Sequence, residues 1–474
     1  MLFNSSVFVV FFLVVYALYL VSRRSCRVQN YLLVVASYIF YGYWDPRFLI
    51  LIFASTVIDF FVGRTLDNSE DAGRRKALVI TSVMANLAIL GFFKYFDFFT
   101  DSAVDILALA GLQADRVTLD IVLPVGISFY TFQTMSYTID IYRKRLHHTS
   151  NFVDFALFVS FFPQLVAGPI ERAVNLLPQL TKPRHITVDT VNTGLFLILW
   201  GYFKKMVIAD NMAVIANTIF NSYESYHGLD IAVGTVAFAF QIYADFSGYS
   251  DIARGVSKLL GIDLMVNFKL PYFALNPSDF WLRWHVSLST WLRDYLYIPL
   301  GGNKGTSFGT YRNLALTMLL GGLWHGAAWN FVIWGAFHGT ILVIYRLLDR
   351  NPEHTDPWGG EFSRTRVFGK MTLMLTLTMI GWIIFRSQSV HQIVYMLTNI
   401  GFEVGNRATL VRGYELLFFA WPLIAVQIAQ YVTRDLLVLT KLNLWWRSLA
   451  YGFLLTWIAI FGVAESTEFI YFQF

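Results

Sequence analysis

The sequence predicts an all-α polytopic membrane protein. Charged residues make up only 14% of the 474 residues, against about a quarter in a soluble domain. The mean hydropathy is +0.53, and apolar runs of about 20 residues, the length that a membrane-spanning helix needs, recur along the chain. These runs are too continuous for the alternating pattern of a membrane β-barrel. By run length we expect roughly eleven or twelve membrane segments in a single domain over residues 1–474.

The first apolar run, Leu2–Val21, predicts a retained helix rather than a cleaved signal peptide. No basic region precedes it, and no small-residue cleavage site follows it. Three arginines come next, Arg23, Arg24 and Arg27. The positive-inside rule places them in the cytoplasm. The N-terminus is then outside. Further spans are expected at Tyr31–Tyr43, Phe48–Val62, Ala77–Phe99 and Ile121–Ile141, and an external loop with a short interfacial helix at Asp101–Asp120.

The second part of the chain predicts both spans and irregular segments. Phe152–Gly168 is apolar and is followed by prolines and glycines, which favours a broken or re-entrant segment. Val191–Ile208 and Leu229–Tyr249 have the composition of spans, whereas Ile252–Phe280 is typical of an interfacial segment. Closing spans are expected at Lys370–Phe385, Tyr414–Tyr431 and Trp446–Phe461.

Two aspartates, Asp245 and Asp251, lie in or next to the span Leu229–Tyr249. A carboxylate at the centre of a membrane helix costs about 2.5–3.5 kcal/mol on insertion scales. We therefore expect both side chains to be paired or to face a cavity.

Composition also excludes several classes of function. The net charge of +5 is small for this length and fits loop lysines and arginines facing an anionic lipid leaflet, so we expect membrane lipid and no nucleic acid as a partner. One cysteine, Cys26, excludes an internal disulfide and a multi-cysteine metal site. The chain has no zinc-protease, Walker, dinucleotide or GxSxG motif. We expect neither a metal nor a serine-hydrolase mechanism.

Ionisable groups, aromatics and glycines are densest in Asp279–Gly339. The first part, Asp279–Leu300, predicts one amphipathic helix that lies in the interface plane or lines a cavity mouth. Helical spacing puts on one face Trp281, His285, Leu288 and Leu292, and on another Arg283, Ser287 and Asp294. Taken alone, this pattern favours a plain interfacial anchor.

His325 lies inside continuous apolar sequence, between LTMLLGGL and GAAWNFVIWGAF. Ionisable residues inside a membrane helix are functional candidates, although hydrogen-bonded packing is the alternative. Neighbouring glycines remove side chains, so we expect a substrate to approach the imidazole closely. Burial favours the neutral imidazole, which can accept a proton. On a continuous helix His338 would lie about 140° from His325, on the face of Trp324, so we expect a structural or supporting role for it.

A neutral buried histidine beside a second one suits general base catalysis. Such a group can take the proton of a hydroxyl that attacks a thioester, without a metal ion and without a permanent charge in the bilayer.

Two sequence blocks, Arg283–Asn303 and Tyr311–Gly339, closely resemble the membrane-bound O-acyltransferase family, in the branch that O-acetylates alginate and other exopolysaccharides. Further blocks of similarity are Leu123–Arg143, Phe161–Arg172 and Tyr243–Gly255. The resemblance implies a ring of tilted helices, with re-entrant and interfacial helices, around a central funnel or tunnel.

The resemblance also implies the chemistry. It assigns the catalytic position to His325 and a second one to His285, and the tunnel wall to Trp281, Arg283, Arg293, Asp294, Trp324 and Asp245. The donor would be acetyl-CoA or a similar acetyl thioester, with no permanently bound cofactor. The acetyl group would cross the bacterial inner membrane to periplasmic serine-type acetyltransferases, which modify a polymer such as alginate or cellulose.

Three other functions remain open at this point. One is the D-alanyl transfer protein of teichoic acid modification. Another is a proton-coupled transporter, in which a relay would use Asp59, Asp140, Asp245 and His325, although we find no inverted repeat. The last is a scaffold for polymer export without catalysis.

Overall fold

The computed structural model describes residues 1–115, 118–119, 122–166, 168–348, 364–463 and 469–470. These residues are helical, apart from turns, loops and one isolated bridge between Gly228 and Ile400. They form two compact units. The first comprises Met1–Gly194 with Val256–Met265, and the second comprises Leu195–Gly255 with Val266–Phe474.

Seven helical stretches of the described residues are long and apolar enough to cross a membrane. They are Pro46–Asp67, Ala72–Leu109, Leu229–Leu259, Trp329–Leu348, Thr365–Arg386, Arg407–Thr433 and Leu444–Phe461. The all-α polytopic class is therefore confirmed. The number is smaller than the expected eleven or twelve, because expected spans such as those in α2 (Cys26–Gly42) and α6 (Ile127–Tyr142) form helices of only 17 and 16 residues, short of the roughly 20 that cross a bilayer unaided.

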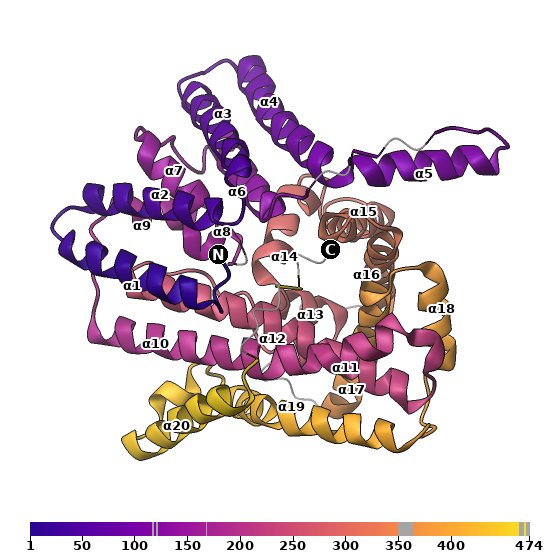
Figure 1. Ribbon diagram of the computed structural model, residues 1–474. Coiled ribbons are helices and arrows are strands. Elements are labelled where there is room, and N and C mark those ends of the chain that lie inside the picture. Colours follow the sequence, from indigo (N-terminus) through magenta and orange to yellow (C-terminus); the bar gives the residue numbers. More distant parts are fainter. Residues whose placement is uncertain (116–117, 120–121, 167, 349–363, 464–468, 471–474) are drawn as a thin grey trace. The chain divides into compact units, whose positions relative to one another are not determined.

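The first unit is built around helices joined by buried polar contacts. α3 (Leu49–Asp67) packs against α4 (Ala72–Leu90) and α6 (Ile127–Tyr142), and Figure 1 shows α3 and α4 side by side. Asp59 of α3 accepts hydrogen bonds from Ser82 Oγ (2.6 Å) and Asn86 Nδ2 (2.8 Å) of α4. The carboxylate is thus satisfied within the helix packing, which is how a membrane helix tolerates it.

The remaining helices of this unit agree with some sequence expectations and correct others. α1 spans Ser6–Val21. α4 continues through a π-helical turn (Gly91–Tyr95) into α5 (Phe96–Leu109), so the first half of the expected external loop is helical. The expected break after Phe152 is confirmed by three short helices, α7 (Phe152–Ser160), α8 (Phe162–Leu165) and α9 (Ala173–Thr181).

The second unit holds the central and C-terminal helices. α10 (Val188–Tyr202) belongs to this unit from Leu195 on and passes through a π-helical stretch (Phe203–Ala209) into α11 (Asp210–Asn221). α12 (Leu229–Leu259) is ten residues longer than expected and includes the start of the segment predicted to be interfacial. The helices that follow are α13 (Pro277–Arg283), α14 (Val286–Leu292), α15 (Ser307–His325), α16 (Trp329–Leu348), α17 (Arg364–Arg386), α18 (Val390–Asn399), α19 (Arg407–Thr433) and α20 (Leu444–Phe461).

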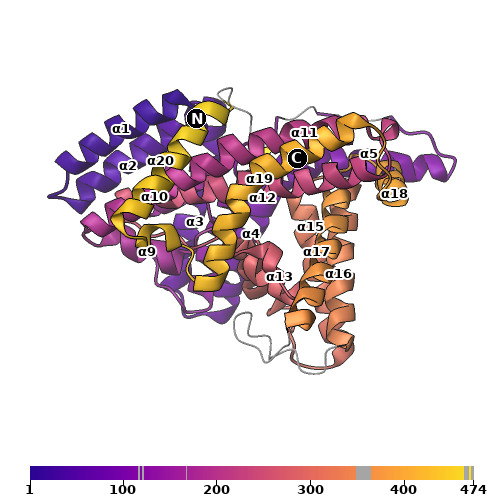
Figure 2. The ribbon, with the colours of Figure 1, turned by 90° about the horizontal axis from the view of Figure 1, so that it is seen from below.

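α15 and α16 form a tight helical hairpin, and α17 packs along α16 (Figure 2). Glycines make the close approach possible. A Cβ on Gly322 of α15 would clash with the Phe331 carbonyl and lie 2.9 Å from the Gly335 Cα of α16. A Cβ on Gly326 would lie only 2.1 Å from a ring carbon of Phe331. The expectation that these glycines leave room for substrate beside His325 is therefore wrong at both positions, because the neighbouring helix fills the space.

Candidate active site

His285 lies at a break between two helices, not within one. α13 begins at the Asn276 cap, whose side chain accepts from Asp279 N at 2.8 Å, and ends at Arg283. His285 then has left-handed backbone angles, φ 44° and ψ 53°, before α14 starts. A branched or bulky residue adopts this region only at a cost, and such strain gathers at functional sites. The expected single amphipathic helix over Asp279–Leu300 is thus wrong.

The break has a physical cause in the segment before α13. The backbone N–H of Val286 donates to Asn267 O and that of Lys269 donates to Arg283 O, both at 2.9 Å. These bonds replace the helical bonds that a continuous helix would need. The residues between α13 and α14 are buried rather than interfacial, since His285 is 0% and Arg283 3% exposed.

Asn267 also determines which nitrogen of His285 carries the proton. Its side-chain oxygen accepts from the Ser287 backbone N–H (3.1 Å) and from Ser287 Oγ (2.9 Å), so this atom is an acceptor. His285 Nδ1 lies 3.2 Å from the same oxygen and must donate to it. The lone pair of the neutral ring is then on Nε2. Burial lowers the pKa of His285 to about 3, so the ring stays neutral at physiological pH.

His325 is the last residue of α15. Gly326 is extended (φ −159°, ψ 154°), and α16 begins at Trp329. The angle of about 140° that we expected between His325 and His338 assumed a continuous helix, and this assumption is wrong. The Trp334 ring contacts both imidazoles, with centroid distances of 5.0 Å to His325 and 4.6 Å to His338.

The two histidines that the sequence ranked first lie together. The ring centroids of His285 and His325 are 6.4 Å apart. Trp324 contacts both, at 6.1 Å from His285 and 5.2 Å from His325. His325 is 4% exposed. Two buried imidazoles thus lie close together among aromatic rings, an arrangement that suits general acid–base chemistry.

The other predicted wall residues divide into two groups. Trp281 lies in the aromatic wall, 5.7 Å from Trp334 and 5.2 Å from His338 between ring centroids. Arg283 forms a buried ion pair with Asp279 at 2.6 Å and holds α13 together. By contrast, Arg293 pairs with its neighbour Asp294 at 2.7 Å and is 53% exposed. No described contact joins this pair to either histidine.

Asp245 forms an ion pair, as expected for a carboxylate in a membrane helix. Its carboxylate lies 2.8 Å from Lys205 Nζ and accepts the backbone N–H of Ile470 at 2.7 Å. The next residue, Phe246, packs edge-on against His285 with a centroid distance of 4.6 Å. Phe469 also packs against Phe246, with a centroid distance of 5.6 Å. Asp245 therefore supports the wall of the site through α12 and does not itself contact the histidines in any described interaction.

Sequence reasoning missed several residues of this site. Asn267 and Phe268 come from a segment predicted to be a plain interfacial one, and Phe385 of α17, 5.5 Å from His325, comes from the last turn of a predicted span. The adjacent Lys204 and Lys205 were also missed, although they interrupt an apolar run of the sequence. In the structure each of them pairs with one aspartate of α12. Matching charges on two expected spans predicts such pairs.

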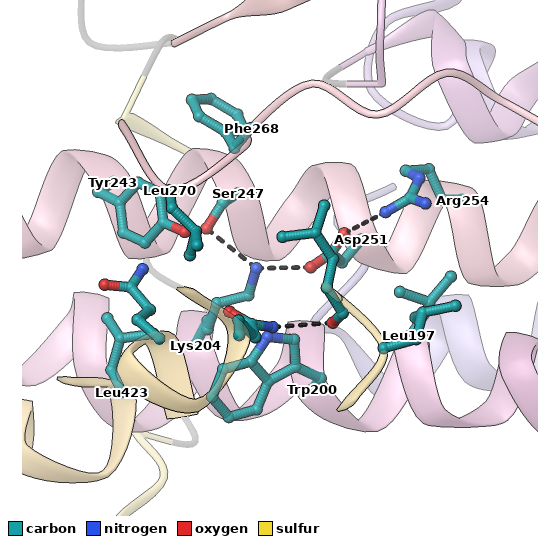
Figure 3. A pocket seen from close by; sticks show the side chains of 14 residues that line it. Leu197, Trp200, Lys204, Tyr243, Ser247, Asp251, Arg254, Phe268, Leu270 and Leu423 are labelled. Carbon is teal, nitrogen blue, oxygen red and sulfur yellow. Dashed lines mark hydrogen bonds and ion pairs between the residues drawn. The ribbon is translucent and has the colours of Figure 1, made fainter. Parts of the chain in front are cut away.

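A pocket opens beside this site, with its lining wholly in the second unit. The space in it that is open to the centre of a water molecule is about 30 Å³, and α10, the π-helical stretch, α12 and α19 contribute side chains to it. Figure 3 shows Lys204 between Ser247 and Asp251, with Arg254 on the far side of Asp251. Asp251 is thus both paired and exposed to a cavity, as expected for a carboxylate in a membrane helix. Among the described residues no group of three potential metal ligands occurs.

The sequence of this chain is similar to those of several known proteins. Residues 141–358 match the model of the membrane-bound O-acyltransferase family. The chain is 42% identical over 438 residues to the probable alginate O-acetylase of Pseudomonas aeruginosa, covering 88% of this chain and 81% of the relative. It is 34% identical over 427 residues to the peptidoglycan O-acetyltransferase of Helicobacter pylori, covering 84% and 79%.

A more distant relative is the teichoic acid D-alanyltransferase of Bacillus subtilis, 28% identical over 237 residues, which are 48% of this chain and 60% of the relative. All three relatives have names of acyl transfer enzymes, and two of them are similar over most of this sequence. The chain therefore belongs to the membrane-bound O-acyltransferase family and is an O-acyltransferase with a multi-pass membrane fold.

Proposed function

We propose that this protein is an inner-membrane O-acetyltransferase that takes an acetyl group from a cytoplasmic thioester and passes it across the membrane for O-acetylation of an exopolysaccharide. The observation that supports this most is the pair of neutral buried imidazoles, His285 and His325, at 6.4 Å between ring centroids. The similarity to O-acetylating relatives over more than four fifths of the chain supports acetyl as the group.

In this proposal His325 is the general base. An acceptor hydroxyl attacks the carbonyl carbon of the acetyl thioester while its proton moves to a ring nitrogen of His325. The carbon–sulfur bond then breaks, and the leaving sulfur takes the proton from the imidazolium. The products are an acetyl ester and a free thiol, and the histidine is again neutral. His285, with its Nδ1 proton bound to Asn267, keeps a second neutral ring beside His325 and adds no charge to the site.

The acceptor on the outer side would be a periplasmic serine-type acetyltransferase, which then modifies the polymer. The alternative of D-alanyl transfer has less support, because the teichoic acid relative covers less than half of this chain. A proton relay through the membrane aspartates also has less support. Asp59 is bound by Ser82 and Asn86, and Asp245 by Lys205, so both carboxylates have structural partners.

The test is the His325→Ala variant in cells that make the polymer. We expect acetylation of the polymer to be lost, with a normal amount of the protein in the membrane and normal polymer secretion. Full acetylation in this variant would exclude His325 as the catalytic base. Loss of secretion together with acetylation would instead favour transport or export as the function.

A further inference from the structure

Arg386 is a half-buried cation at the end of α17 that has no carboxylate partner among the described residues. Both of its described hydrogen bonds run from Nη2 to amide oxygens of α11, to Asn217 Oδ1 at 2.9 Å and to Asn221 Oδ1 at 3.3 Å. Its guanidinium carbon lies 5.6 Å from the centroid of the Phe220 ring. The donors on Nε and Nη1 have no acceptor in the same part of the chain and are available to a ligand.

Other buried cations of the second unit show how the chain usually compensates such a charge. Each of five pairs with an aspartate at 2.6–2.9 Å, and none of their side chains is more than 19% exposed. They are Lys204, Lys205, Arg254, Arg283 and Arg412. Arg386 instead meets neutral amides and the carboxyl end of α11, which supplies only the partial negative charge of a helix terminus. A guanidinium removed from water is stabilised better by an anion, so this position favours an anionic ligand.

Arg386 lies on the outer side of the membrane. α15 and α16 form a hairpin, and the Phe385 ring near the end of α17 lies 5.0 Å from the Phe331 ring near the start of α16. The start of α15, the end of α16 and the start of α17 therefore share the opposite end of this group. Basic residues gather there, namely Lys304, Arg312, Arg346, Arg366 and Lys370. The positive-inside rule places that end in the cytoplasm, so His325 and Arg386 lie at the outer end.

The last turn of α17 connects Arg386 with the histidine site. Phe385, the residue before it, lies 5.5 Å from His325 between ring centroids. Its carbonyl accepts from Asn330 Nδ2 at 3.0 Å, which fixes this turn against α16. Neighbouring residues of a helix point about 100° apart, so Phe385 faces the histidine site while Arg386 faces α11. A ligand on Arg386 is then held at the outer end of the helix that walls the site.

The groups around Arg386 suit a sugar. The side-chain nitrogens of Asn217 and Asn221 have no acceptor among the described residues, so they can donate to sugar oxygens. The turn after α11 adds Tyr223, whose ring contacts Tyr395 of α18 at 5.3 Å and whose hydroxyl lies 3.0 Å from His391 Nδ1. Tyrosine has an apolar ring face and a polar hydroxyl, and a sugar ring likewise has apolar faces and polar edges.

We propose that this outer corner, formed by Arg386, Asn217, Asn221 and Tyr223, binds a uronate residue of the exopolysaccharide. The sugar carboxylate accepts from the guanidinium, and sugar hydroxyls accept from the asparagine amides, because charge-assisted hydrogen bonds are about twice as strong as neutral ones. The proposal rests on the proposed function and deepens it, since it makes the polymer an acidic one that this chain itself contacts. An acidic peptide would also use the guanidinium, but it has no sugar hydroxyls for the two amides.

The test measures binding of fluorescent hexamannuronate to the purified full chain by fluorescence anisotropy. The protein is held in nanodiscs of phosphatidylcholine, a lipid without net charge. Cellohexaose has the same number of sugars and no carboxylate, and hexaglutamate is a peptide with the same number of side-chain carboxylates. We expect hexamannuronate to bind and both unlabelled competitors to displace it at least about tenfold less well than unlabelled hexamannuronate.

Variants then assign the binding to the corner. Arg386→Gln should weaken hexamannuronate binding about tenfold or more, because it removes a charge-assisted contact. Arg386→Lys keeps the charge and loses the planar set of donors, so its affinity should fall between the two; this variant carries the test if Arg386→Gln does not fold. Arg407→Gln is the matched control. Arg407 is an exposed arginine at the start of α19, on the same side of the membrane because α18 is too short to cross it.

The outcomes separate this corner from the proposed function. Equal hexamannuronate binding by the wild type and both Arg386 variants overturns the proposal, and so does no binding by the wild type, which leaves Arg386 a structural partner of α11. Equal competition by cellohexaose overturns recognition of the carboxylate, and stronger competition by hexaglutamate replaces the polymer by an acidic protein. His325→Ala should bind hexamannuronate like the wild type and lose acetyl transfer. Retained transfer in that variant would overturn the proposed function and leave the binding result unchanged.

Discussion

Asn267 Oδ1 accepts the proton of His285 Nδ1 at 3.2 Å, and the same oxygen accepts from the backbone N–H of Ser287. A backbone donor cannot reverse its role, so the tautomer of His285 is fixed by the protein rather than chosen by the substrate. The left-handed backbone at His285 brings the ring into this position. Asn267 is therefore a positioning residue for the second histidine.

Replacing Asn267 by Ala should lower the rate of acetyl transfer about tenfold or more, because His285 then loses the bond that selects its tautomer. Asn267→Asp keeps an acceptor oxygen at the same place and should restore much of the rate. Nitrogen NMR of labelled histidine gives the independent readout, since the Nε2 signal should change from that of an unprotonated nitrogen toward a mixture. An unchanged spectrum in Asn267→Ala would contradict the assignment.

His285→Ala should reduce transfer more than His338→Ala. His285 contacts His325 directly, whereas His338 reaches it only through Trp334. The comparison uses initial rates of acetyl transfer at equal membrane level of the two variants. Wild-type activity in His285→Ala would show that His285 only packs in the fold and takes no part in transfer.

The fold should become less sensitive to acid when His285 is removed. The pKa of His285 is about 3 in the folded protein and about 6.5 in an unfolded chain. Between these values the unfolded state binds more protons, so this group makes stability fall as the pH is lowered from about 6.5 toward 3. The melting temperature of His285→Gln in detergent should therefore decrease less between pH 7.5 and 5 than that of the wild type. Parallel curves would show that the pKa of His285 in the folded protein is close to its value in the unfolded chain.

Gly326→Ala should destabilise the protein by about 1–3 kcal/mol, the usual cost of overpacking, since the added methyl group has no space beside Phe331. Gly413 of α19 is the matched control, because nothing lies within 4 Å of a Cβ at that helical position. Gly413→Ala should leave the melting temperature unchanged or raise it slightly. Equal behaviour of the two variants would show that the α15–α16 hairpin is looser than described.

Lys205→Met should destabilise the fold by about 3–5 kcal/mol, because it leaves buried carboxylates without their cation. Lys205 Nζ lies 2.8 Å from Asp245 and 2.9 Å from Asp210, and all three side chains are at most 3% exposed. Lys441→Met removes a 72% exposed partner of Asp435 and should have little effect. Thermal unfolding of the purified variants makes the comparison, and a normal melting temperature for Lys205→Met would contradict a buried ion triad.

Sequence patterns predicted the fold class, the broken segment after Phe152 and the pairing of Asp245 and Asp251, because apolar run length, prolines and the cost of a buried charge act locally. They did not predict the position of His338 or the break at His285. Both depend on backbone partners from distant segments: Asn267 and Lys269 replace the helical bonds of α13, and Gly326 ends α15 where Phe331 packs over it. Periodicity assumes a continuous helix and cannot reveal such interruptions.

The most direct test of the account is transfer of labelled acetyl from acetyl coenzyme A by the purified protein, with and without a periplasmic serine-type acetyltransferase. We expect label on the acceptor with wild-type protein and with His338→Ala, and a loss of at least about a hundredfold, or roughly 2.7 kcal/mol of transition-state stabilisation, with His325→Ala. Transfer by His325→Ala at the wild-type rate would contradict the central claim that the histidine at the end of α15 is the catalytic base.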